Sequence, residues 1–224
     1  MSRQSNLVTS ILRDLGDPCG WPEPVEFRGS LALCTLNSVY TLRATSTSAI
    51  NVLNRYRDLR ACSATDSGPD LLESMKDAGG PEPFAVDVLR NESKLPGTTR
   101  LRTVGVYEAL TKFSAPEIAV TTAGGLRVSS DLSAARRAWL SVTGLGKQSW
   151  SYLLMNAGVE TETKVDVMLK RYVGRAAREN LEDKEREVRR LVRDASTTLN
   201  VHPRRLDRAI WWHESRYGRA SQGD

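Results

Sequence analysis

Two short stretches of this 224-residue chain combine residue types whose spacing could do chemistry. In the first, "VTGLGKQSW" at 142–150, Gly144 and Gly146 stand directly before a helical pattern. Glycines let a backbone pass close to a ligand, and the start of a helix presents unpaired N–H groups with a partial positive charge. Such a turn can bind an anion, of which a DNA phosphate is the natural example, and Lys147 adds a full positive charge.

The second stretch, "KVDVMLKRYV" at 164–173, has a single Asp166 at the expected start of a helix. A carboxylate there can serve as a helix cap, which is its ordinary role, or as an ionised catalytic group. The glycine turn also has an ordinary explanation, because glycines allow two helices to be joined by a tightly packed turn. The two stretches alone leave both alternatives open.

The elements that must position these residues are helical. Apolar residues recur at helical spacing almost throughout, and only 117–130, "EIAVTTAGGLRVSS", competes as a short hairpin. We therefore expect an all-α protein. Asp131 should cap one helix start and Pro203 should begin another helix, while Gly158 and Gly218 should end helices. The helices are expected at about 4–15, 27–38, 45–58, 68–77, 83–89, 98–111, 115–122, 131–141, 147–157, 166–178, 180–196 and 203–217.

Charge and cysteine content narrow the class of protein. Basic side chains exceed acidic ones by 32 to 27, and the excess is confined to residues 164–224, which carry 15 basic and 10 acidic side chains. This uneven charge is typical of nucleic-acid binding, although a solvated basic helix face also explains it. The three cysteines form no metal-ligand pattern and suit a reducing compartment. Because no apolar run approaches the roughly 20 residues that span a bilayer, and the charged start lacks a secretory core, we expect a cytoplasmic protein without membrane contact.

Together, the turn and Asp166 resemble the signature of the helix-hairpin-helix DNA glycosylases related to endonuclease III. Those proteins carry a hairpin of the form L-P-G-V-G-x-K followed by a V-D-T-H-V-like segment, and here the two segments read "VTGLGKQ" and "KVDVMLKRYV". Eighteen residues separate Gln148 from Asp166, which is the separation expected of endonuclease III itself. The resemblance extends over about 130 residues, of which the hairpin and Asp166 are the specific part.

The resemblance implies roles for the turn and for Asp166. Asp166 would be catalytic: it would stabilise a sugar with cationic character and position or deprotonate the attacking water. DNA phosphates would be bound by the residues of the turn, namely Thr143, Gly144, Gly146, Lys147 and Gln148.

The resemblance extends upstream to "LALCTLNSVYTLRATSTSAINVLNRYR" at 31–57, which is similar to the family's early helix, loop and helix. In family members a short segment after a serine reaches into the duplex. Tyr40 is the residue expected to fill the stack from which a base has been rotated, with Ser38, Leu42 and Arg43 beside it in the base pocket or wedge. The alternative is that Tyr40 is a core residue of its helix.

Several residues depart from the family pattern. Gln148 stands where members that also cut the backbone have a Schiff-base lysine, and an amide cannot form that adduct. Thr143 replaces the hairpin proline, Met168 replaces a histidine, and no cysteine follows Cys62, so the iron–sulfur cluster is missing. The implied protein is a monofunctional enzyme that needs no metal or cofactor, although the hairpin would accommodate a monovalent cation.

The C-terminal segment "IWWHESRYG" at 210–218 concentrates Trp211, Trp212, His213 and Glu214. These side chains could contact a base or supply a further general acid, or they could anchor the helix against the rest of the protein. The sequence favours anchoring, because aromatic residues at helical spacing are usually packed.

From these features we expect a two-lobed helical protein with a cleft between the lobes. Residues 29–143 would form a central lobe, while 1–28 and 144–224 would form the second lobe, and the helix-hairpin-helix would span 131–158. The expected function is a monomeric DNA glycosylase that releases a damaged or modified base from double-stranded DNA, in base excision repair or in defence against modified phage DNA. The alternatives are a non-catalytic helix-hairpin-helix DNA-binding protein and a bifunctional glycosylase/lyase.

Overall fold

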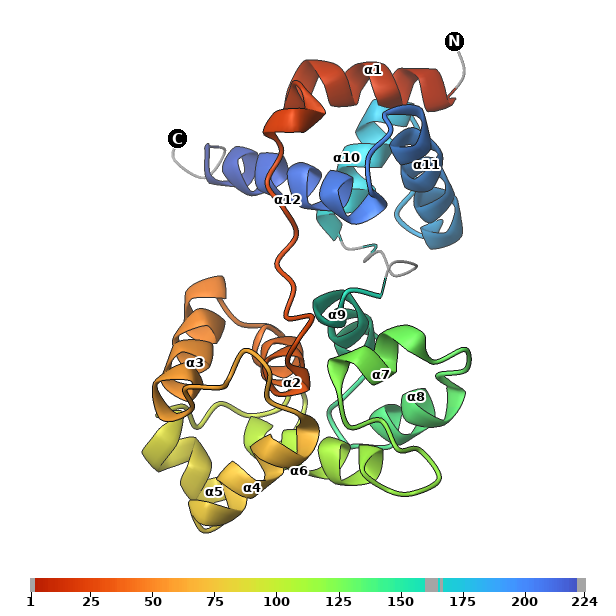
Figure 1. Cartoon of the computed structure of the whole chain (residues 1–224). Coiled ribbons are helices and arrows are strands. Elements are labelled where there is room, and N and C mark those ends of the chain that lie inside the picture. The colour runs from red at the N-terminus through yellow and green to blue at the C-terminus, as the bar shows by residue number, and fades with distance from the viewer. Residues whose placement is uncertain (1–2, 160–164, 166, 221–224) are drawn as a thin grey trace. The chain divides into compact units, whose positions relative to one another are not determined.

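The computed structural model describes residues 3–159, 165 and 167–220, and every regular element in this part of the chain is helical (Figure 1). The all-α class is therefore confirmed. An isolated bridge joins Lys94 to Leu101. The elements in chain order are α1 (Arg3–Leu15), η1 (Pro18–Gly20), α2 (Leu31–Tyr40), α3 (Ser46–Leu59), α4 (Gly68–Asp77), α5 (Pro81–Pro83), η2 (Phe84–Val88), α6 (Arg102–Phe113), α7 (Ala123–Val128), α8 (Ser133–Leu140), α9 (Lys147–Ala157), α10 (Val167–Ala177), α11 (Glu185–Thr198) and α12 (Pro203–Ala220).

The chain forms two compact units, which are described separately. The central unit is Glu26–Val159, and the terminal unit combines Met1–Val25 with Glu160–Asp224. The sequence prediction places the boundary between residues 143 and 144, and so assigns α9 to the lobe made by the chain ends. In the structure α9 belongs to the central unit.

The reason for this difference is the apolar face of α9. Trp150, Leu153, Leu154 and Ala157 are buried in the same core as α2, and α9 packs directly on α2. A helix that buries this face within the central unit cannot belong to the other one.

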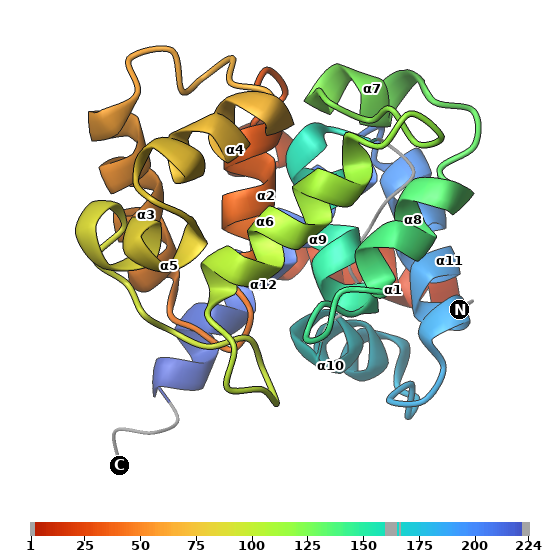
Figure 2. The same cartoon turned by 90° about the horizontal axis from the view of Figure 1, so that it is seen from below.

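The helix α2 is the centre of the central unit. Nine of its ten residues are buried, with Asn37 the exception, and it contacts α3, α4, α6 and α9. In both views α3, α4 and α5 gather on one side of α2 and α7, α8 and α9 on the other (Figures 1 and 2). A helix that is apolar on all faces is stable only when it is covered on all sides.

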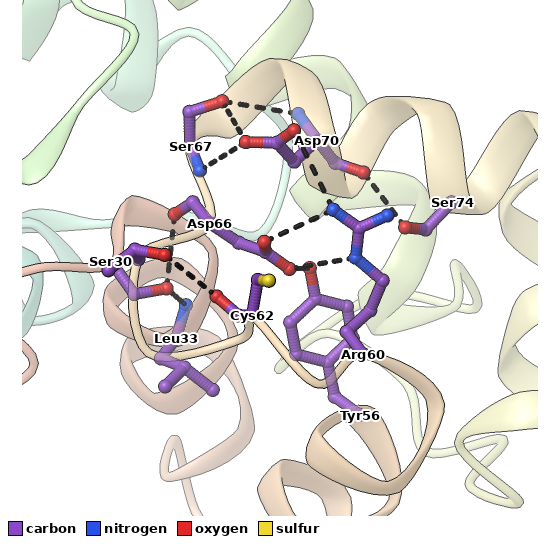
Figure 3. A network of polar contacts seen from close by, with 10 residues as sticks. Ser30, Leu33, Tyr56, Arg60, Cys62, Asp66, Ser67, Asp70 and Ser74 are labelled. Carbon is purple, nitrogen blue, oxygen red and sulfur yellow. Dashed lines mark hydrogen bonds and ion pairs between the residues drawn. The ribbon is translucent and has the colours of Figure 1, made fainter.

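The N-terminal end of α2 is held by a polar network around Asp66, whose side chain is 3% exposed (Figure 3). The carboxylate accepts hydrogen bonds from the Tyr56 hydroxyl at 2.6 Å and from Arg60 at 3.0 and 3.1 Å. The Asp66 carbonyl accepts hydrogen bonds from the Ser30 hydroxyl and the Ala32 amide, at the first turn of α2. Burial, with a further contribution from the hydrogen bond to Asp66, raises the pKa of Tyr56 far above its ordinary value.

The C-terminal end of α2 is held by Arg102, the first residue of α6. Its guanidinium donates hydrogen bonds to the carbonyls of Val39 and of Leu42, the latter at 2.6 Å, and lies 5.8 Å from the centre of the Tyr40 ring. Arg102 is 5% exposed, and burial lowers its pKa. Its bonds add a charged donor to the Val39 carbonyl, which also accepts from the Leu42 amide at 3.4 Å, and tie Leu42, which follows the helix end, to α6.

In the described part of the terminal unit, α1, α10, α11 and α12 contact one another pairwise. Its core combines Leu7 and Ile11 of α1 with Leu169 and Val173 of α10, and with apolar residues of the other two helices. Glu214 of α12 is buried within this unit and binds Arg175 of α10.

Most helix positions agree with the sequence prediction, and the main exception lies between 115 and 130. The expected helix at 115–122 is wrong: the chain turns there, with Ala119 at a φ of +50°. The helix α7 follows instead, because the Thr122 side chain accepts a hydrogen bond from the Gly125 amide and caps its start. The competing hairpin does not form in this segment.

The predicted starts and ends of helices hold in three of four cases. Asp131 accepts a hydrogen bond from the Ser133 amide at 2.7 Å, Pro203 begins α12, and Gly158 ends α9 with a φ of +81°. Gly218 does not end the last helix, which continues to Ala220. No helix in the described part of the chain is both long and apolar enough to cross a membrane.

Replacing Asp66 by alanine is expected to destabilise the central unit. The change removes the carboxylate that accepts from the Tyr56 hydroxyl and from Arg60, which keeps its ion pair with Asp70 at 3.6 Å, so the free energy of unfolding should fall by about 3 kcal/mol. The change Tyr56→Phe removes one donor and should cost about 1 kcal/mol. Denaturant unfolding of the whole chain measures both.

The matched control is Asp58→Ala, because Asp58 is an exposed aspartate on α3. This change should alter the free energy of unfolding by less than about 0.5 kcal/mol. If Asp66→Ala were no more costly than Asp58→Ala, the network would not hold the start of α2.

Candidate nucleic-acid interface

The connection between α8 and α9 is a tight turn over residues 141–146. The Leu145 amide donates to the Val142 carbonyl at 3.0 Å, and Gly144 has a φ of +94°. Val142 and Leu145 are buried, whereas Thr143 and Gly146 are exposed. The turn therefore uses its apolar residues as anchors and presents the residues between and after them to solvent.

Gly144 is required by the fold itself. Its positive φ disfavours any residue with a side chain, and a Cβ atom at this position would lie 2.7 Å from Cβ of Leu95 and 3.3 Å from Cγ2 of Thr98. For this glycine, the explanation by tight packing is therefore sufficient.

The segment that packs against Gly144 is the loop of residues 94–101. Lys94 pairs with Leu101, and the Leu95 amide donates to the Arg100 carbonyl at 2.9 Å. The Arg100 side chain donates to the Thr143 carbonyl at 3.4 Å and forms an ion pair with Glu108. The loop therefore brings a guanidinium to the glycine turn.

Gly146 differs from Gly144 in both respects. Its backbone is extended, with φ −127° and ψ −174°, and nothing lies within 4 Å of the position that a Cβ atom would take. Neither the backbone conformation nor any neighbouring atom of the described chain requires a glycine here. The absence of a side chain instead leaves the start of α9 open to a group from outside.

The start of α9 is held in place by the hydroxyl of Ser149. This oxygen accepts hydrogen bonds from the Gly146 amide at 3.1 Å and from Nε1 of Trp139 at 2.9 Å, and it donates to the Gly146 carbonyl at 2.8 Å. Trp139 is fully buried. The hydroxyl thus links α8 to α9 at the turn.

The charges and N–H donors at the start of α9 favour binding of an anion. In the described part of the chain, the amides of Lys147 and Gln148 have no hydrogen-bond acceptor, as first-turn amides of a helix commonly do not. The Lys147 side chain is exposed beside them, and Arg100 lies against the turn. Together these groups supply N–H donors, a helix N-terminus and the full positive charge of Lys147, which is the chemistry that binds a phosphate.

Of the five residues predicted to bind phosphate, four form this exposed surface. Thr143, Gly146, Lys147 and Gln148 are exposed, and we call them, together with Arg100, the turn face. Gly144 lies in the same turn, but its role is to let the 94–101 loop approach. Sequence analysis missed Arg100, although the Pro96–Gly97 pair before it was a signal for a turn at that position.

Three of the four residues predicted to form the base pocket or duplex wedge are buried. Tyr40 is 1% exposed and packs beside Arg102, Leu42 is 6% exposed, and the Ser38 hydroxyl donates to the Thr35 carbonyl inside α2. Of the four, Arg43 alone is exposed, with a φ of +47°. Tyr40 is a core residue because α2 is covered on every side.

The predicted catalytic residue, Asp166, lies outside the described residues. The helix α10 begins at the next residue, Val167, which is 68% exposed. Among the described residues, no group of three or more His, Cys, Asp and Glu side chains is arranged to hold a metal ion.

The two glycines of the turn should respond differently to the same substitution. Gly144→Ala places a Cβ in the left-handed region and against Leu95, so the free energy of unfolding should fall by about 2 kcal/mol. In Gly146→Ala the new Cβ contacts no atom of the described chain, and alanine readily adopts the extended backbone at this position. The free energy of unfolding should therefore fall by less than about 0.5 kcal/mol. Denaturant unfolding distinguishes the two, and equal costs would contradict the assignment of Gly144 to packing.

Comparison with known proteins assigns the chain to a family. No curated protein and no solved structure matches the chain. A family model matches residues 5–215, a range that includes the turn face and the greater part of both units. The model is described as a domain of unknown function, and the chain is a member of this family, DUF8548.

Proposed function

We propose that this protein binds the phosphate backbone of double-stranded DNA through the turn face and acts on it as a monofunctional DNA glycosylase. The observation that carries the proposal is the open start of α9. There Gly146 has no neighbour within 4 Å of its Cβ position, beside two amides without acceptors in the described chain and the exposed Lys147.

A phosphate is the anion that fits these groups best. Amides at a helix N-terminus bind phosphate oxygens without reading a base, so such a contact is independent of DNA sequence. The glycine lets the strand approach the backbone closely, and Lys147 neutralises the charge of a phosphate. The basic excess of residues 164–224 adds attraction to the same polyanion.

The glycosylase step rests on Asp166 and on the resemblance to the endonuclease III group. Cleavage of the bond between deoxyribose and a base passes through a sugar with cationic character, which a carboxylate stabilises. The same carboxylate can position or deprotonate the attacking water, and the product is an abasic site. With Gln148 at the lysine position there is no Schiff-base nucleophile, so the strand is left uncut.

A second candidate function is DNA binding without catalysis. The burial of Tyr40 and Leu42 favours it, because a glycosylase must fill the stack that the rotated base leaves. Arg43 is exposed and would have to provide that contact in the enzyme. The experiments below separate the two candidates.

Duplex binding should depend on the turn face rather than on overall charge. Lys147→Ala should weaken binding to a 20-base-pair duplex and reduce the slope of log K against log salt by about 0.9, the value for one lost phosphate contact. Gly146→Val, which fills the open position, should weaken binding without changing the net charge. Fluorescence anisotropy at several salt concentrations measures both effects.

The matched control for charge is Lys112→Ala, at an exposed position on α6. It should leave affinity and salt slope close to those of the wild type. If Lys112→Ala and Lys147→Ala weakened binding equally, the turn face would not be the site of contact.

Catalysis should depend on the carboxylate of Asp166. The wild type should release a base from at least one duplex in a panel of alkylated, oxidised, deaminated and bulky modified bases, as detected by alkali cleavage at the abasic site. Asp166→Asn should bind that duplex with unchanged affinity and release the base at least about a hundredfold more slowly. Asp183→Asn, at an exposed aspartate of the same unit, should be fully active. Unchanged release by Asp166→Asn would refute the catalytic assignment, and binding without release from any duplex would favour the second candidate.

The absence of a Schiff-base lysine can be tested directly. Borohydride should trap no covalent complex between the wild type and abasic DNA, because an amide forms no imine with the opened sugar. A trapped complex that disappears in Lys147→Ala would show instead that the enzyme is bifunctional.

A further inference from the structure

A cavity of about 360 Å³ lies within the terminal unit, between the end of α1, the η1 segment and the last turns of α12. Its walls include two indoles, a carboxylate, an imidazole and a guanidinium. These side chains belong to Trp21, Trp212, Asp14, His213 and Arg216. None of them belongs to the turn face.

The aromatic wall of the cavity is partly open to solvent. Trp212 is 43% exposed, which is unusual for an indole, since tryptophan is highly buried on average. The guanidinium of Arg216 lies 4.6 Å from the centre of the Trp212 ring, one helical turn further along α12. Trp21 is 5% exposed, and its Nε1 donates to the Leu15 carbonyl at 3.0 Å, so this wall is fixed. The cavity thus offers an indole surface with a cation held beside it.

The carboxylate of Asp14 is an acceptor that the surrounding residues hold ionised. It accepts hydrogen bonds from Arg13 at 2.7 and 3.1 Å and from the Tyr172 hydroxyl at 3.3 Å. The hydrogen bond from Arg13, opposed in part by burial, holds the pKa of Asp14 below its ordinary value. An ionised carboxylate has about four acceptor sites, so one more N–H donor can be accommodated.

The imidazole of His213 is packed against Tyr172, which also contacts Asp14. Its ring lies edge-on to Tyr172, with 5.9 Å between the ring centres. Tyr172 therefore contacts both Asp14 and His213 and positions the two polar groups of the cavity relative to each other. Imidazole can donate and accept hydrogen bonds, which suits the edge of a heterocycle.

We infer that this cavity binds a single nucleotide, with the base against Trp212, an amino group of the base at Asp14 and the phosphate at Arg216. Each wall group then meets its chemical complement: a π-surface meets a base, an acceptor meets an amino donor, and a cation meets an anion. A purely apolar ligand would cover the charges of Asp14 and Arg216 without adding a polar contact to either, and a cation would be repelled by Arg216 and Arg13. A volume of about 360 Å³ is near the lower limit of ligand sites, which suits one nucleotide.

The nucleotide can come from two sources, namely a free mononucleotide or one unit of a single strand. Both present the same base and phosphate. The cavity lies in the terminal unit and the turn face in the central unit, so nucleotide binding does not depend on DNA binding by the turn face.

The test is calorimetric titration of the full chain with adenosine monophosphate, adenosine, inosine monophosphate and a single-stranded oligo(dA) of eight residues. Adenosine monophosphate should bind saturably. Inosine monophosphate should bind more weakly, because it presents a carbonyl oxygen to Asp14 where adenine presents an amino group. Trp212→Ala should weaken every ligand at least tenfold, as loss of a stacking platform does.

Arg216→Gln separates the phosphate contact from the base contact. It should weaken adenosine monophosphate about tenfold and leave adenosine unchanged. The matched control is Arg208→Gln, because Arg208 also lies over an indole of α12, that of Trp211, at 4.9 Å, but neither residue lines the cavity. This control should bind adenosine monophosphate as the wild type does. Arg216 is exposed, so its replacement should leave the fold intact.

The outcomes decide both the proposal and the source of the nucleotide. Binding of the mononucleotide with these variant effects supports a free nucleotide, and binding of the oligonucleotide alone, with the same effects, supports a nucleotide within a strand. The proposal is overturned if neither ligand binds at millimolar concentration, or if Arg208→Gln weakens binding as much as Arg216→Gln. Lys147→Ala should not change nucleotide binding, so a failure of the turn-face proposal leaves this result unaffected.

Discussion

A helix buried on every side must have the polar groups at both of its ends satisfied from within the protein, and this constraint on α2 organises the central unit. At its start, the backbone carbonyl of Asp66 accepts hydrogen bonds from Ser30 and Ala32, while the Asp66 carboxylate is held by Tyr56 and Arg60. At its end, Arg102 reaches the carbonyls of Val39 and Leu42. The charged side chains of Asp66 and Arg102 are therefore buried at the two ends of α2. Their contacts also fix the segments that carry them, namely the loop before α4 and the start of α6.

The position of the turn face is fixed by segments that pack on α2. Arg102 begins α6, so the loop that precedes it is anchored at one end of α2, and Leu95 of that loop packs against Gly144. The helix α9 packs on α2 directly, and Ser149 fixes its first turn to Trp139 of α8. An exposed set of donors is thus mounted on rigid elements, as an anion site requires, because a binding group held in place loses little conformational entropy when its ligand arrives.

The terminal unit is packed from helices of both chain ends and contains a cavity lined by aromatic and charged side chains. Its helices come from opposite ends of the chain, and the meeting of α1 with α12 brings Asp14 beside His213 and Arg216 in one cavity. Arg13 and Tyr172 hold Asp14 as an ionised acceptor, and Arg216 lies over the exposed Trp212. The phosphate chemistry proposed for the turn face and the nucleotide chemistry proposed for this cavity therefore depend on separate sets of contacts.

Local signals in the sequence were enough to determine the helical class, most helix positions and the exposed turn before α9. They sufficed because capping, glycine conformation and apolar periodicity act over a few residues, as at Asp131, Gly158 and Pro203. Only the tertiary structure decided which glycine of the turn is needed for packing, because Leu95 is distant in sequence from Gly144. The burial of Tyr40 likewise depends on helices that cover α2 from elsewhere in the chain, and the cavity at Asp14 requires α12, whose residues follow almost two hundred positions later. Contacts of this kind are set by the packing of whole helices, which no short stretch of sequence encodes.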